Sequence, residues 1–116
     1  MKEDLDRFLP LSPAAMHILF SLAGEARHGY GIMQEIARES EGGYKLGPGT
    51  LYENLRKLMK DGLIEETENS GTGAEARRRY YRLTKSGRRL IMLEIGRLEA
   101  AIREAKMNLG FQRSLV

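Results

Sequence analysis

The spacing of apolar residues changes near residue 62, and that change constrains the fold more than any other feature. Before it, apolar residues recur every three or four positions, as they do on helices that bury one face. After it, residues 63–68 and 77–84 are typical of strands, and the second segment is rich in tyrosine and alternates between two faces. At 116 residues the chain is long enough for one compact domain and too short for two. A mainly α domain with a small β-hairpin is expected.

Three short helices are expected in the first half of the chain. Ser12 has the chemistry of an N-cap and Pro13 suits the first helical position. The second helix follows the sequence "GEARHG", which breaks the periodic pattern, and its expected apolar stripe consists of Tyr30, Met33, Ile36 and Ala37. The third begins at Pro48 and ends before Asp61-Gly62, and its expected buried face consists of Leu51, Leu55 and Leu58.

A long last helix is expected after Thr84, which has the chemistry of an N-cap. Its apolar residues follow a heptad spacing over about two and a half repeats: Ile91, Ile95, Leu98, Ile102, Ala105 and Leu109. Two interpretations exist, a helix folded back on its own core and a helix paired with a second copy. The homodimer is favoured, because the preceding elements suffice for a core of their own.

The basic charge is concentrated in one segment. Residues 77–89 hold seven Lys or Arg and no acid, whereas residues 1–68 carry a net charge of −4. Such a patch favours a polyanion such as double-stranded DNA, and the plain alternative is a solvated face. No apolar run is long enough to span a membrane, the N-terminus does not resemble a secretory signal, and the chain has no cysteine. A cytoplasmic protein without a membrane partner is expected.

Three helices followed by a hairpin is the order of a winged helix-turn-helix, in which the third helix enters the major groove and the hairpin lies along the backbone. We expect this DNA-binding domain at residues 1–84, with an N-terminal extension at 1–11, and a dimerisation helix and tail at 85–116. The candidate DNA contacts on the third helix are Gly49, Thr50, Tyr52, Glu53, Arg56, Lys57 and Lys60, and those on the hairpin are Arg77, Arg78, Arg79, Tyr80 and Arg82.

These candidates differ in the role expected of them. Arg56 and Lys57 are the better candidates for base or phosphate contacts, whereas Glu53 either accepts from cytosine N4 or only solubilises the helix. Lys60 contacts DNA or is simply a solvated lysine. On the hairpin, Tyr80 and Tyr81 point to opposite faces, so one ring joins the core and the other hydroxyl is free for the DNA backbone.

Three blocks of sequence resemble the signatures of the PadR family of bacterial transcriptional regulators. They are "HGYGI" at 28–32, "GPGTLYENLRKLMKDGLIEE" at 47–66 and "RRRYYRLTKSGRRL" at 77–90. The resemblance spans about residues 11 to 90, and the single C-terminal helix is similar to that of the compact branch of the family. It implies a homodimeric repressor, often autoregulatory, in which the last helix mediates dimerisation. Tyr52 matches the tyrosine of the family's GTLY motif, which implies a DNA contact; the alternative is a ring packed under the hairpin.

The resemblance also implies release of the operator by a small aromatic or drug-like effector or by a stress signal. Candidate effector residues are Phe8, Met16, Met92, Ile95 and Leu98, for which a plain core role is the alternative. The chain has no tryptophan to hold a planar ligand by indole stacking.

Other functions have less support in the sequence. Residues 47–49 do not form a phosphate-loop motif, and His17 and His28 lack carboxylate neighbours in a metal-binding pattern. No nucleophile elbow or paired acids indicate catalysis, so neither an enzyme, a cofactor nor a metal is expected. The remaining alternative is a winged-helix adaptor that binds another protein and has no specific DNA site.

Overall fold

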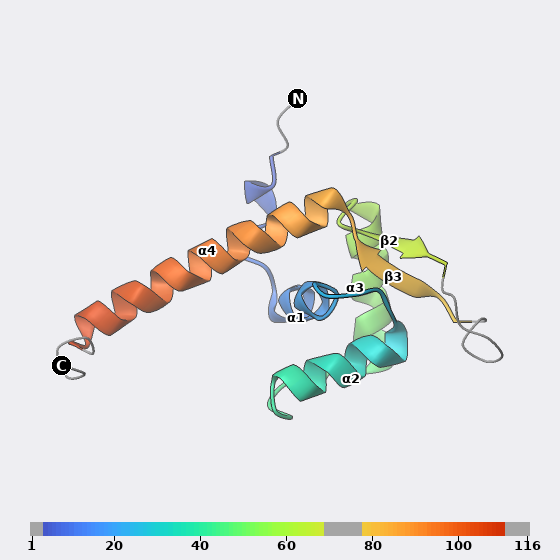
Figure 1. The fold of residues 1–116 in the computed structure, drawn as a ribbon, viewed down its shortest axis with the longest axis horizontal. Coiled ribbons are helices and arrows are strands. Elements are labelled where there is room, and N and C mark those ends of the chain that lie inside the picture. Colours follow the sequence, from blue (N-terminus) through green and yellow to red (C-terminus); the bar gives the residue numbers. More distant parts are fainter. Residues whose placement is uncertain (1–3, 69–77, 111–116) are drawn as a thin grey trace.

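The computed structural model describes residues 4–68 and 78–110. Its elements are a 3-10 helix η1 (Asp6–Phe8), α1 (Pro13–Ser21), β1 (Arg27–His28), α2 (Gly29–Glu39), α3 (Pro48–Lys60), β2 (Ile64–Thr67), β3 (Tyr80–Leu83) and α4 (Lys85–Asn108). The expected mainly α fold, a winged helix-turn-helix with a small β-hairpin, is confirmed. Figure 1 shows α1, α2 and α3 as one body, with β2 and β3 at its edge and α4 extending past it.

The helices begin where their caps predict. The Ser12 hydroxyl accepts a hydrogen bond from the Ala15 N–H (3.2 Å), and the Thr84 hydroxyl accepts one from the Gly87 N–H (3.0 Å). Thr84 also donates to the Gly62 carbonyl (2.7 Å), so the same side chain caps α4 and ties it to the end of α3. Gly62 has a φ of +75°, which glycine adopts without steric cost. That turn leads directly from α3 into β2.

The sheet has three antiparallel strands in the order β1-β3-β2, not the two that the sequence predicted. The third is β1, which lies in the segment that interrupts the first two helices and pairs Arg27 with Tyr81 and His28 with Tyr80. The second expected strand is shorter than predicted, since β3 begins at Tyr80. Within it the expected alternation is confirmed, because Tyr81 and Leu83 are buried and Arg82 is exposed. Arg77 and the segment between the two expected strands, residues 69–76, lie outside the described residues.

The core lies between the three helices, the inner face of the sheet and the first turns of α4. The predicted stripe of α3 is confirmed, since Leu51, Leu55 and Leu58 are all buried. The predicted stripe of α2 is wrong at Tyr30, which is 56% exposed; Ile32 occupies the buried position beside Ile36. The helix is therefore rotated relative to the prediction, and the Tyr30 ring faces outward.

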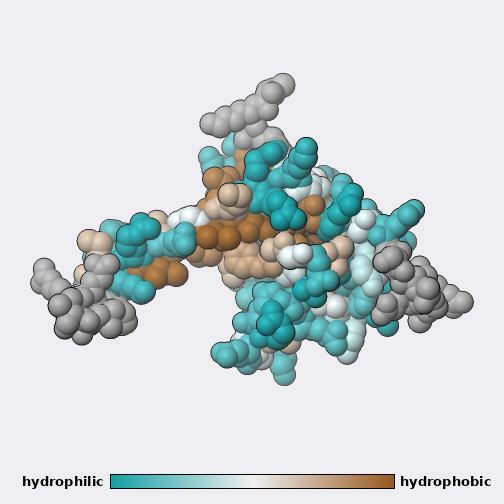
Figure 2. Space-filling model, viewed as in Figure 1, coloured by the Kyte–Doolittle hydropathy of each residue, from teal (hydrophilic) through white to brown (hydrophobic). Residues whose placement is uncertain are grey.

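Helix α4 divides into two parts. Leu90 and Ile91 are buried in the core of their own chain, whereas residues 99–109 are all exposed. The exposed part of the predicted seam therefore begins at Ile95 (42% exposed) and continues through Ile102 (54%) and Leu109 (81%). Figure 2 shows apolar atoms along α4 beside the body and again near its far end. Among the described residues no helix combines the length and apolar character needed to cross a bilayer.

Candidate nucleic-acid interface

The outward face of α3 is fixed by its buried leucines. Because Leu51, Leu55 and Leu58 point into the core, the opposite face of the helix is turned to solvent. All the candidates predicted on this helix are exposed: Gly49, Thr50, Tyr52, Glu53, Arg56, Lys57 and Lys60. Four of these side chains are charged, and three of those are basic. The geometry thus presents a mixed but basic face of α3 for contact with another molecule.

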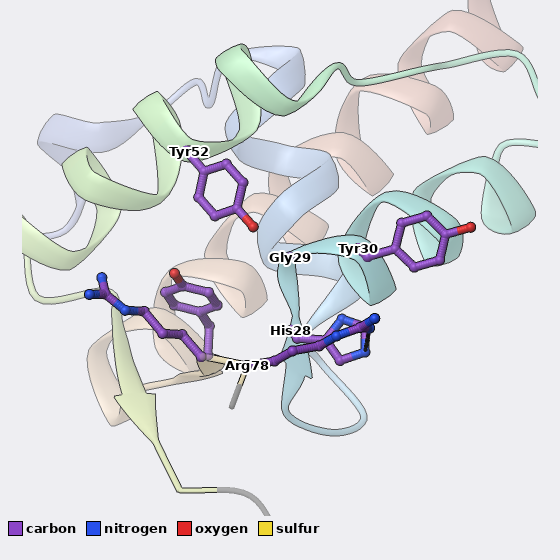
Figure 3. A pocket seen from close by; sticks show the side chains of 7 residues that line it. His28, Gly29, Tyr30, Tyr52 and Arg78 are labelled. Atoms are coloured by element: carbon purple, nitrogen blue, oxygen red, sulfur yellow. Dashed lines mark hydrogen bonds between the residues drawn. The ribbon is translucent and has the colours of Figure 1, made fainter. Parts of the chain in front are cut away.

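Tyr52 lies at one flank of that face and approaches the start of α2. Its ring extends from α3 toward Gly29, as Figure 3 shows. A Cβ atom built on Gly29 would be 2.4 Å from the Tyr52 hydroxyl oxygen, so only glycine leaves room for this ring position. Tyr52 remains 43% exposed. Tyr52 therefore packs on the backbone of α2, while its outer edge stays accessible. The sequence offered a packed ring and a DNA contact as alternatives, and this position has features of both.

His28 connects the start of α2 with the base of the wing, the hairpin formed by β2 and β3. Its Nδ1 accepts a hydrogen bond from the Gly31 N–H (2.9 Å), which caps α2. Its Nε2 lies 3.0 Å from Nη1 of Arg78, and its ring meets Tyr80 edge-on at a centroid distance of 5.2 Å. The sequence placed His28 in a family motif without giving it a role. Only the pairing of β1 with β3 shows that it stands beside the wing.

The Arg78 guanidinium group carries only N–H donors, and a phosphate oxygen is an acceptor suited to such a group.

These side chains line one pocket of about 410 Å³ between α2, α3 and the wing. The pocket is formed by His28, Gly29, Tyr30, Tyr52, Arg78, Arg79 and Tyr81. Tyr81 forms its inner wall, and burial raises the pKa of its hydroxyl, so that group stays neutral. The lining of this pocket comes from both α3 and the wing, so the contact surfaces predicted on these two elements are adjacent.

The wing is less basic than its sequence suggests. Nε of Arg82 lies 2.7 Å from a carboxylate oxygen of Glu65, and Arg79 lies 3.6 Å from Glu66, in both cases across the two strands. These exposed pairs offset part of the positive charge. Sequence counting missed this, because the acids belong to a strand that precedes the basic segment.

The candidate effector residues do not form one described site. Phe8 is half-buried and lines a pocket beside α3, while Met92 on α4 is 68% exposed. Met16 and Leu98 are half-buried. The N-terminal arm, residues 4–12, is joined to α4 at another point, where the Leu11 N–H donates to Oε2 of Glu94 (3.1 Å).

Glu94 is buried and was not singled out by the sequence. The Arg97 guanidinium beside it holds the pKa of its carboxyl below the usual value, against the opposing effect of burial.

The sequence shows no metal-binding pattern around His17. In the structure its ring stacks on the ring of Tyr44 at a centroid distance of 4.3 Å. Within residues 4–68 and 78–110, no cluster of three or more His, Asp or Glu side chains is arranged to hold a metal ion.

Comparison with known proteins identifies the family. The family model described as the transcriptional regulator PadR-like family matches residues 18–92, more than half of the chain. A transcriptional regulator of Mycobacterium tuberculosis is 37% identical over 89 residues, which cover 77% of this chain and 78% of that protein.

Solved structures agree in fold. A transcriptional regulator of Clostridium thermocellum matches with a TM-score of 0.68 and 25% identity, covering 92% of this chain and 96% of that one. A PadR family transcription regulator of Clostridium difficile matches with a TM-score of 0.65 and 26% identity, covering 86% and 99%. PadR of Bacillus subtilis, solved in complex with operator DNA, has a TM-score of 0.61 and 24% identity over 72% of this chain and 45% of that one. Members of this family are transcriptional regulators and not enzymes, and the chain belongs to the PadR-like family of transcriptional regulators.

Proposed function

We propose that this regulator is a homodimeric repressor that binds a pseudo-palindromic operator. In this proposal α3 of each copy enters the major groove and the wing lies along the phosphate backbone. Residues 1–84 form the DNA-binding domain and residues 85–116 the dimerisation helix and tail. The protein acts in the cytoplasm, where its DNA is.

One observation carries the proposal. Polar side chains from three separate elements, His28 before α2, Tyr52 on α3 and Arg78 at the wing, line one pocket beside the exposed basic face of α3. Hydrogen-bond donors to phosphate commonly come from such side chains and fix the register of a protein on DNA. Bacillus subtilis PadR, which was solved in complex with operator DNA, shares this fold and supports DNA as the partner.

The proposed dimer rests on the apolar face of α4. Ile95, Ile102 and Leu109 are all more than 40% exposed, although they are large apolar side chains on one face of a long helix. A second α4 would cover them in a coiled-coil-like pairing. Two recognition helices would then reach half-sites about one helical turn, roughly 34–36 Å, apart. A pseudo-palindromic site follows from that two-fold symmetry.

Fluorescence anisotropy tests the DNA-binding part. The protein is titrated into its own upstream promoter duplex and into a scrambled duplex at three salt concentrations. We expect a preference of about a thousandfold or more for the operator, with one dimer per site and a steep salt dependence. Equal binding to promoter fragments from the whole genome would contradict the proposal and favour the protein-adaptor alternative.

Sedimentation tests the dimer. We expect Ile102→Asp to give a folded monomer, because a charge in the paired face costs more than the pairing gains. Ala100→Asp is the matched control, since Ala100 is exposed and lies off the seam. If both variants remain dimeric, α4 does not form the interface.

We propose that a small molecule or a stress signal lowers the affinity of the dimer for its operator. A reporter gene downstream of the operator, compared in cells with and without the regulator, measures repression directly; higher expression with the regulator present would identify an activator instead.

A further inference from the structure

A second pocket lies on the other flank of α3, away from the wing. It has a volume of about 290 Å³ and separates the N-terminal arm from the C-terminal half of α3. Tyr52 and Asn54 are two residues apart on the helix and therefore point to different flanks. Helix α3 thus has a pocket on each side, and the two pockets share no lining residue.

The arm that forms one wall of this pocket is anchored at both ends. Leu5 is buried in the core at 7% exposure, and the Leu11 N–H is held by the buried carboxylate of Glu94. Between them, the Arg7 guanidinium lies over the Phe8 ring, 4.4 Å from its centroid. The pocket wall is therefore built into the fold and does not depend on a loose terminus.

Apolar side chains form more than half of the lining of the pocket, beside the polar Ser12 and Asn54. Phe8 and Leu11 from the arm, Ala15 from α1 and Leu58 from α3 line it. Its volume is near the lower end of the range of about 300–1,000 Å³ typical of small-molecule sites. A compact apolar body the size of one ring fits such a space, whereas a drug-sized molecule does not.

The rim of the pocket carries more positive than negative charge. Arg7 and Lys57 line it from opposite walls, with Asp61 as its acid. Lys57 and Asp61 are four residues apart on α3, yet among the described residues neither takes part in an ion pair within 4.0 Å. A lysine ammonium beside an apolar pocket is a suitable partner for a carboxylate or sulfonate group.

We propose that this pocket binds a compact apolar anion, and that the anion competes with DNA for Lys57. The lysine belongs to two surfaces at once, because it lines the pocket and lies on the exposed face of α3 proposed to contact DNA. An anion paired with Lys57 withdraws that charge from a phosphate. The second part of this inference rests on the proposed function, and the first part does not.

Competition of this kind has a measurable signature. Loss of one phosphate contact lowers the slope of log K against log salt by about 0.9 for each copy of α3 on the DNA. Binding free energies are reciprocal, so the operator also weakens the affinity for the anion by the same factor. No rearrangement of the domain is required.

The test measures ligand binding to the full chain without DNA. Cyclohexanecarboxylate and its neutral isostere cyclohexanecarboxamide are titrated, and binding is followed by calorimetry and by amide chemical shifts. We expect shifts in the arm and the second half of α3 and a preference of about threefold to fivefold for the carboxylate, the size of a partly exposed ion pair. Equal affinity for acid and amide, or shifts confined to α4, would overturn the inference.

Two substitutions with opposite expected effects on the preference for the carboxylate, together with one control, make the test more specific. Lys57→Met should abolish the preference for the carboxylate, and Asp61→Asn should increase it, because one removes the attracting charge and the other the repelling one. Lys60→Met is the matched control, since Lys60 is exposed on the same helix but does not line the pocket. A loss of preference in Lys60→Met as large as that in Lys57→Met would reject the assignment of Lys57.

The same titration in the presence of operator DNA separates the two proposals. If the carboxylate binds but no duplex is bound specifically, the pocket stands and the DNA-binding proposal fails. If the operator binds and the carboxylate does not, the pocket inference alone fails. If both bind without affecting each other, the competition for Lys57 is refuted.

Discussion

Replacing Gly29 with alanine should weaken DNA binding without unfolding the protein. The added Cβ would lie 2.4 Å from the Tyr52 hydroxyl oxygen and 2.9 Å from Cζ, where ordinary contact is 3.4–4 Å. The hydroxyl must therefore move by about 1 Å or more, or the ring must leave the pocket. Since the obstructing atoms are the far end of a side chain, the ring yields and the backbone does not.

The expected magnitudes for stability and affinity differ. The obstructing atoms belong to a side chain that can rotate outward, so the cost in stability should be small and the thermal midpoint should stay within about 5 °C. If Tyr52 donates to a phosphate, its displacement should cost about 1.5 kcal/mol of DNA affinity, roughly tenfold. Anisotropy with the operator duplex and thermal unfolding measure the two quantities separately.

Two further proteins decide whether the effect runs through Tyr52. Gly24→Ala is the matched control, because nothing lies within 4 Å of its added Cβ, and it should leave DNA binding unchanged. In a Tyr52→Ala background, Gly29→Ala should have no further effect on affinity, since the obstructing ring is gone. The reasoning is refuted if Gly29→Ala binds DNA normally or if its effect persists in that background.

Three other predictions follow from single contacts. Gly87→Ala should lower the free energy of unfolding by about 1–3 kcal/mol in urea titrations, because its Cβ would lie 2.0 Å from a backbone carbonyl oxygen at the start of β2, which cannot move aside. The Glu94 carboxyl, whose pKa Arg97 lowers below 4.5, should contribute stability that is complete above that pH and is lost as the pH falls below it; comparing urea midpoints at about pH 6 and about pH 3 measures this loss. Glu65→Gln should free Arg82 for the DNA backbone and steepen the salt dependence of binding by up to about 0.9 per copy, measured by anisotropy.

Each of these changes has a control of the same chemistry. Gly96→Ala adds the same methyl group to α4 where nothing lies within 4 Å, and should stabilise the helix. Glu94→Gln should show a smaller difference between the two pH values than the unchanged protein, and an equal difference would show that other carboxylates cause it. Glu99→Gln removes one negative charge from an exposed position on α4, and a salt slope as steep as that of Glu65→Gln would mean that net charge alone explains the effect.

Features with local causes were predictable from the sequence, and features that depend on distant pairing were not. Ser12 and Thr84 were identified as helix caps because a cap needs only its own first turn. Strand β1 is two residues long and exists through its pairing with β3, more than 50 positions later, so no periodic signal marks it. Its absence from the prediction also hid the position of His28 beside the wing.

The number of basic residues was predictable from the sequence, but the ion pairs that they form were not. The arginines of the basic segment were visible, but the register of β2 on β3 decides that Glu65 lies opposite Arg82. Glu94 was not singled out by the sequence, although it is buried and holds the arm. Patterns along the chain thus identify the interface, while the pairing of strands and the packing of the arm determine its electrostatics.

The far half of α4 is the strongest physical argument for a partner. The helix has 24 residues, and its buried residues all fall between Gly87 and Glu94. An isolated helix of fewer than about 12–15 residues is marginal in water, and Gly96 costs this one about 1 kcal/mol more relative to alanine. Its exposed turns carry Ile102 and Leu109 on one face, and water does not stabilise these side chains. A second copy of the same helix would supply the missing contacts, and the separation of the two recognition helices would then be fixed by α4 itself.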